Sequence, residues 1–142
     1  MGWTGAEAWI FVSIGDASAE GRASLDKVIG AADANNHAIP AIGEFELAVG
    51  QLLGARLITA TPDAYSLTPD GRHLFGTINS ATRDRFARWM ETARNWQSRP
   101  PSEAAPVSWS VDPAKFKEAY QQYDRRFSKT YRSLEKRRKG GR

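Results

Sequence analysis

The chain has 142 residues, a formal net charge of +4 and no cysteine, and 41% of its residues are hydrophobic. This length suits one compact core, and the lack of cysteine excludes a disulfide framework, a thiolate zinc site and a cysteine nucleophile. The longest apolar run, residues 8–14, is far shorter than the roughly 20 residues that cross a membrane. The N-terminus lacks the cationic start of a signal peptide, so we expect a cytoplasmic protein that does not bind membranes.

Charge is distributed unevenly along the chain. Residues 1–76 carry nine acidic and four basic residues, whereas residues 115–142 carry eleven basic and three acidic residues. A basic tail next to an acidic body suggests an arm that contacts phosphates, an acidic partner or the body itself.

Three helices are predicted in the first part of the chain. Thr4 and Glu7 have the spacing of a capping box, which predicts a helix over residues 5–17. Because this helix is apolar almost all round, we expect it to be central and buried. Two further helices are predicted over residues 25–35, capped by Ser24, and over residues 40–54.

The third predicted helix contains several glycines. Gly43, Gly50 and Gly54 fall on one side of it, and Gly54 has the position of a C-terminal glycine. A glycine inside a helix costs on the order of 1 kcal/mol relative to alanine. Something is therefore expected to pack close to this backbone: the second helix, the following hairpin or a partner chain.

A hairpin and a further helix follow. Two short strands are predicted over residues 56–61 and 64–67, joined by a tight turn, and Thr68 with Pro69 starts a helix. A longer helix is predicted over residues 80–97. Large aromatic side chains on one side of it either cover the first helix or contact a partner: Phe86, Trp89 and Trp96.

The C-terminal part has its own character. Residues 98–110 contain three prolines and are predicted to be an unpacked, semi-extended linker, before a helix within residues 111–142. Large apolar side chains recur on this helix with a mean spacing of about 3.6 residues: Phe116, Tyr120, Tyr123, Phe127, Tyr131 and Leu134. Such a stripe must bind the chain's own body, a second subunit or another protein.

The segment from residue 54 to residue 75 resembles the wing region of the MarR/PadR type of transcriptional regulators. The matching residues are Gly54, Leu57, Ile58, Tyr65, Leu67, Thr68 and Gly71. The resemblance covers about residues 5–76. It implies a mostly α winged helix-turn-helix, with three helices and a two-stranded wing followed by additional helices, in a DNA-binding protein that dimerises through a helix after the wing.

The third helix differs from one that reads DNA. Its outer face carries Glu44, Leu47 and Gln51 but no cation, and the hairpin tip carries Asp63. Gln51 could pair with an adenine edge, but phosphate contacts supply most of the non-specific affinity for DNA. The residues predicted to make them lie on the C-terminal helix: Lys117, Arg125, Arg126, Lys129, Arg132 and Lys136.

Catalysis is not expected. His37 and His73 are the only histidines, and neither a metal-binding spacing nor a phosphate-binding glycine motif is present. We therefore expect no metal and no cofactor.

The expected organisation is a winged-helix domain with a post-wing helix over residues 1–97, a linker over 98–110, and a basic amphipathic helix over 111–142. Two functions remain open. One is a regulator that binds nucleic acid, as a homodimer, through phosphate contacts from the C-terminal helix. The other is a protein-interaction module that uses the acidic third helix and the aromatic C-terminal helix.

Overall fold

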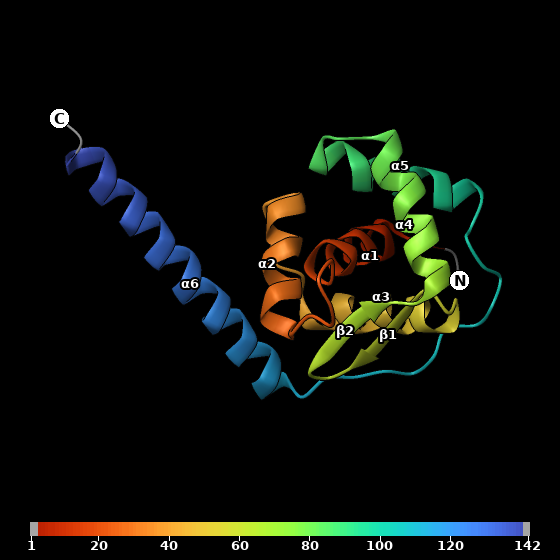
Figure 1. Cartoon of the computed structure of the whole chain (residues 1–142). Coiled ribbons are helices and arrows are strands. Elements are labelled where there is room, and N and C mark those ends of the chain that lie inside the picture. Colours follow the sequence, from red (N-terminus) through yellow and green to blue (C-terminus); the bar gives the residue numbers. More distant parts are fainter. Residues whose placement is uncertain (1–2, 141–142) are drawn as a thin grey trace.

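The fold is that of a computed structural model, which describes residues 3–140 and, within them, all side chains except those of Tyr131 and residues 135–140. The described residues form six helices and one two-stranded antiparallel sheet (Figure 1). In chain order the elements are α1 (Gly5–Ala17), α2 (Leu25–Asn36), α3 (Ile42–Gly54), β1 (Ile58–Thr61), β2 (Ala64–Leu67), α4 (Pro69–Ala81), α5 (Arg85–Ser98) and α6 (Pro113–Gly140). The predicted mostly α class is confirmed.

Helix α1 lies at the centre of the body. The predicted capping box is present, since the backbone N–H of Thr4 donates to Glu7 at 2.9 Å and the Thr4 hydroxyl accepts from Ala6. Residues 7–15 are buried, because α2, α3 and α5 pack around this helix. The prediction of a central buried helix is confirmed, and an apolar surface on every side is the physical reason for its position.

The hairpin is joined to the body by its second strand. Strands β1 and β2 pair with Ile58 opposite Leu67. Tyr65 is fully buried and its ring packs on Phe45 at a centroid distance of 5.8 Å. The backbone of Tyr65 also exchanges two hydrogen bonds with Ala23, at 2.8 and 2.9 Å, so the connection between α1 and α2 is tied to β2.

The chain between α4 and α5 differs from the prediction. The helix expected over residues 80–97 begins only at Arg85, because α4, which Thr68 caps, continues to Ala81. Thr82 has an extended backbone, and the side chain of Asp84 then accepts a hydrogen bond from the N–H of Ala87 at 2.8 Å. An aspartate cap therefore starts a new helix three residues after the previous one ends.

The end of α3 also differs from the prediction. Gly54 belongs to the helix, and the residue with a left-handed backbone is Arg56, whose φ is 60°. A Cβ atom on Gly54 would lie 2.2 Å from the carbonyl oxygen of Ala105. Glycine at position 54 is thus required by a close approach of backbone, not by the reversal of the chain.

Residues 104–111, which we call the strap, pack along α3. The N–H of Val107 donates to the carbonyl of Gly50 at 2.9 Å, and the N–H of Val111 donates to the carboxylate of Glu46 at 2.9 Å. The ring of Trp109 packs on Phe45 at a centroid distance of 6.0 Å. The prediction of an unpacked linker is therefore wrong. The strap, and not the second helix, the hairpin or a partner chain, is what packs against Gly50 and Gly54, and nothing packs against Gly43 in the described chain.

Helix α6 is the longest helix and its C-terminal part extends away from the body (Figure 1). Its start at Pro113 agrees with the prediction, and the side chain of Asp112 accepts a hydrogen bond from Ala114 at 2.9 Å. Among residues 3–140, no helix combines the length and the apolarity needed to cross a bilayer.

Candidate functional site

The first turns of α6 complete the core next to α3 and the hairpin. The ring of Phe116 packs on Phe45 at a centroid distance of 5.6 Å, and Ala119 is buried. At the hairpin tip, Lys115 forms an ion pair with Asp63 at 3.4 Å. This segment therefore covers part of the surface that the resemblance assigns to DNA.

Helix α2 holds the middle of α6. The ring of Tyr123 lies against Gly30, where a Cβ atom would be only 2.9 Å from the ring, and the Tyr123 hydroxyl donates to Asp33. Arg126 forms an ion pair with Asp26. The aromatic stripe of α6 thus docks on its own chain up to residue 126, one of the arrangements that the sequence left open.

The docking contacts shift the pKa of two groups. Burial opposes ionisation of Asp26, but hydrogen bonds from Ser24 and Arg126, together with the charge of Arg126, outweigh it and hold the pKa of this carboxyl below its usual value. Burial, and then the hydrogen bond to Asp33, raise the pKa of Tyr123. The Asp26 carboxylate is therefore charged and the Tyr123 hydroxyl is neutral near neutral pH.

We expect Arg126→Ala to lower the free energy of unfolding by about 0.5–1 kcal/mol near neutral pH, because half of the Arg126 side chain is exposed. The folded-state pKa of Asp26 is depressed. Its charged form therefore contributes stability that is present above the unfolded-state pKa and lost as the pH falls below about 4. Urea unfolding from about pH 6 to about pH 3 should show the difference shrinking. Arg125→Ala is the control, and a pH-independent difference for Arg126→Ala would contradict the prediction.

Away from its docked face, α6 presents exposed cations along its length, and beyond residue 126 it also presents exposed apolar side chains. Of the cations predicted to contact phosphate, four are exposed and have no ion-pair partner among the described residues: Lys117, Arg125, Lys129 and Arg132. Arg126, by contrast, forms the ion pair with Asp26. The side chain of Lys136 lies outside the described residues.

The apolar stripe continues beyond Arg126. Phe127 and Leu134 are 56% and 57% exposed, and Tyr120, at the edge of the docked face, is 39% exposed. The side chain of Tyr131 lies outside the described residues. We call residues 127–140 the distal segment, which at a rise of 1.5 Å per residue is about 20 Å long. The ring of Phe127 packs on Tyr123 at a centroid distance of 6.0 Å, but both Phe127 and Leu134 keep more than half of their surface exposed.

The outer face of α3 presents little that could bind DNA. Glu44 is exposed, Leu47 is 75% exposed and Gln51 is partly buried. Gln51 follows Gly50, whose carbonyl the strap binds, and no hydrogen bond among the described residues links Gln51 to the cations of α6. The structure therefore does not join the predicted nucleic-acid residues into one site.

The aromatic side of α5 is used mainly inside the chain. Trp96 packs on Phe11 and Trp89 packs on Trp9, at centroid distances of 5.5 and 6.2 Å, and both α5 tryptophans are buried. The sequence left open whether these side chains cover the first helix or contact a partner. Trp89 and Trp96 cover α1. Phe86, 48% exposed, is the predicted contact residue of α5 that retains substantial surface.

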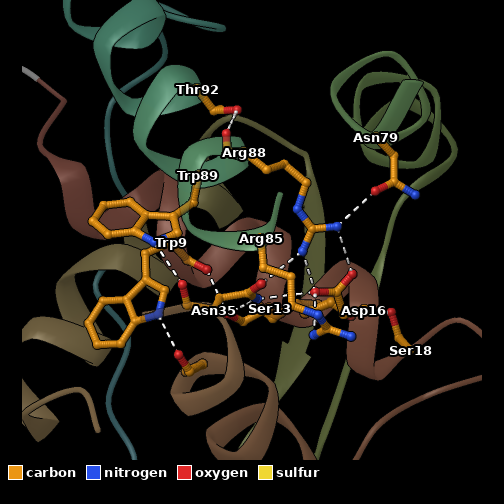
Figure 2. A network of polar contacts seen from close by, with 12 residues as sticks. Trp9, Ser13, Asp16, Ser18, Asn35, Asn79, Arg85, Arg88, Trp89 and Thr92 are labelled. Carbon is orange, nitrogen blue, oxygen red and sulfur yellow. Dashed lines mark hydrogen bonds and ion pairs between the residues drawn. The ribbon is translucent and has the colours of Figure 1, made fainter. Parts of the chain in front are cut away.

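A buried polar network, which the sequence did not indicate, joins four helices (Figure 2). The guanidinium of Arg88 on α5 donates to Asp16 on α1, at 2.5 and 3.1 Å, and to Asn79 on α4 at 2.7 Å. It also donates to Asn35 on α2 at 2.9 Å. No local pattern indicates this network, because Arg88 and Asp16 are 72 residues apart in the sequence.

Among the described residues, no three histidine, aspartate or glutamate side chains gather to hold a metal ion. Comparisons with models of known families, with curated proteins and with solved structures found no match.

Proposed function

We propose that this chain is a non-enzymatic winged-helix protein of the transcriptional-regulator type that binds nucleic acid through phosphate contacts from α6. The observation that carries the proposal is the separation of charge. The exposed cations Arg125, Lys129 and Arg132 lie where α6 leaves the body, whereas the outer face of α3 carries Glu44 and no cation. Since neutralisation of phosphates dominates non-specific affinity, α6 is the favoured contact surface.

The order of elements supports the winged-helix part of the proposal. Three helices precede the antiparallel hairpin, and a helix follows it, as the resemblance implies. The strap along Gly50 and Gly54 and the pair between Lys115 and Asp63 obstruct insertion of α3 and the hairpin into a groove. We therefore propose contacts to the backbone rather than reading of base edges by Gln51.

Binding to a fluorescently labelled DNA duplex, followed by anisotropy at several salt concentrations, tests this proposal. We expect the affinity to fall steeply with salt, and the triple variant Arg125→Glu, Lys129→Glu, Arg132→Glu to lose at least about 100-fold in affinity. For this variant, the slope of the logarithm of affinity against the logarithm of salt concentration should be less steep by about three, one unit for each lost phosphate contact.

The matched control is the triple variant Arg83→Glu, Arg94→Glu, Arg99→Glu, which changes the net charge by the same amount. All three residues are exposed: Arg94 lies on α5, and Arg83 and Arg99 lie just outside its two ends. It should lose much less affinity than the α6 variant. Equal losses would show that binding follows net charge and not α6. Undetectable binding of the native protein at low salt would refute nucleic-acid binding altogether.

Self-association is the second candidate, and the exposed apolar side chains favour it. Phe127 and Leu134 on the distal segment and Leu47 on α3 are each more than half exposed in the described chain. Monomeric proteins rarely leave large contiguous apolar surfaces exposed. A homodimer joined through the distal segment would cover Phe127 and Leu134, while a protein-interaction module would use Leu47 and Glu44.

The molar mass measured by light scattering shows which of these surfaces joins two chains. We expect a mass of about twice the 15.7 kDa chain for the native protein, and a monomer for the variant Phe127→Ser, Leu134→Ser. Leu47→Arg should leave the mass unchanged. If instead only Leu47→Arg lowers the mass, the interface lies on α3. A monomeric native protein would contradict the homodimer.

A further inference from the structure

Helices α2 and α6 border an open groove of about 450 Å³, which is within the usual size of small-ligand sites and therefore large enough for one nucleobase. Its wall contains two aromatic rings, Tyr123 and Phe127 of α6. It also contains two cations, Lys27 of α2 and Arg126 of α6. The groove thus joins aromatic surface to positive charge, the combination with which proteins bind single-stranded nucleic acids.

Phe127 is the exposed ring of this wall. It packs on the ring of Tyr123, yet more than half of its side chain stays exposed. Tyr123 is itself held by α2, through its contact with Gly30 and its hydrogen bond to Asp33. Phe127 is therefore supported from within the chain and presents free surface to the groove, where an unpaired base can stack on it.

The charge of the groove favours a phosphate. None of the residues that line it is acidic. On the neighbouring turns of α2, Asp26 is compensated by Arg126, and Asp33 accepts from the Tyr123 hydroxyl. Lys27 is exposed and has no ion-pair partner among the described side chains, so its charge remains for a phosphate that enters the groove.

The groove and the proposed phosphate contacts lie on opposite sides of α6. With about 100° between consecutive residues, Arg125 and Lys129 lie about 160° around the helix axis from Phe127. A duplex is stiff over roughly 150 base pairs, so it contacts one side of a helix, whereas a single strand bends from the cationic side into the groove. The bases of a duplex are also stacked and paired inside it, and are not free to stack on Phe127.

We propose that this groove binds one unpaired base with its phosphate, and that the nucleic acid preferred by the chain is single-stranded. The base stacks on Phe127 and its phosphate contacts Lys27, while neighbouring phosphates contact Arg125 and Lys129. The inference rests on the proposed function and deepens it by naming the form of the nucleic acid. It also adds a residue of α2 to the contact surface.

Fluorescence anisotropy of a labelled oligonucleotide of about 15 nucleotides, alone or annealed to its complement, tests the inference at one salt concentration. We expect the full chain to bind the strand at least about fivefold more tightly than the duplex, the lower limit for stacking of one base. Phe127→Leu keeps an apolar side chain but removes the aromatic face. It should weaken binding of the strand at least about fivefold and leave binding of the duplex within about twofold.

Two controls have the same chemistry outside the groove. Tyr120 is an exposed aromatic residue of α6 that does not line the groove, so Tyr120→Leu should leave both affinities within about twofold. Arg72 is an exposed cation of α4. Lys27→Glu should weaken binding of the strand at least about fivefold more than Arg72→Glu does.

The outcomes separate the inference from the proposed function. Equal binding of strand and duplex would overturn the inference and leave nucleic-acid binding in place. Equal losses of both affinities in Phe127→Leu would also overturn it, and would assign Phe127 to another contact, such as one with a second chain. Strand binding that Phe127→Leu and Lys27→Glu do not weaken would overturn it as well. Undetectable binding of both probes at low salt would refute the proposed function itself.

Discussion

Replacing Asp16 with alanine is expected to lower the free energy of unfolding by about 3–5 kcal/mol, the range for removal of one partner from a buried ion pair. The variant leaves the guanidinium of Arg88 without its carboxylate partner, while the Arg88 side chain is 6% exposed. Arg85, 3.9 Å from Asp16 and largely exposed, contributes little to the loss. Urea unfolding followed by tryptophan fluorescence measures the change.

Glu20→Ala is the matched control for this prediction, because Glu20 is exposed just beyond the end of α1 and has no ion-pair partner among the side chains that the structure describes. Its effect should stay within about 0.5 kcal/mol. Adding Arg88→Met to Asp16→Ala removes the uncompensated charge, so the double variant should lose less stability than the two single variants together. A loss below about 1 kcal/mol for Asp16→Ala would show that the network does not support the core.

Replacing Gly50 with alanine is expected to destabilise the chain by about 1–3 kcal/mol, although alanine is the better helix former. The new Cβ atom would lie 2.3 Å from the carbonyl oxygen of Val107. The strap must therefore move, and the hydrogen bond from Val107 to Gly50 and the packing of Trp109 are weakened. Thermal unfolding measures the loss, and faster proteolysis within residues 99–112 should accompany it.

Gly43→Ala provides the matched control on the same helix, because no atom lies within 4 Å of a Cβ atom at position 43. This variant should be stabilised by up to about 1 kcal/mol. The two substitutions are chemically identical and differ in the presence of the strap. Stabilisation of equal size in both variants would mean that the strap does not rest on α3 in solution.

Most of the secondary structure could be predicted because its determinants are local. The capping box of Thr4 and Glu7 and the hydroxyl of Thr68 act on backbone groups within three residues. The break between α4 and α5 was predicted before residue 80 and lies at residues 82–84, because this stretch contains no glycine or proline and Asp84 was read as an interior residue of the helix over 80–97. Boundaries of this kind depend on how α4 and α5 pack on α1.

The candidate site was predicted only in part. The exposed cations of α6, such as Arg125 and Lys129, follow from helical periodicity, which places them away from the aromatic stripe. Periodicity gives no partner, however, so it could not show that Arg126 pairs with Asp26, or that Trp89 and Trp96 are buried on α1. Those assignments need the arrangement of helices in space.

By itself, the sequence determined the helical class, the central burial of α1, the hairpin with its turn and the amphipathic character of α6, since each follows from interactions within a few residues. The tertiary structure alone decided that the strap lies on Gly50 and Gly54, that α6 docks on α2, and that Arg88 is buried with Asp16. These contacts join residues more than 50 positions apart, and packing selects such partners only when the whole core has formed.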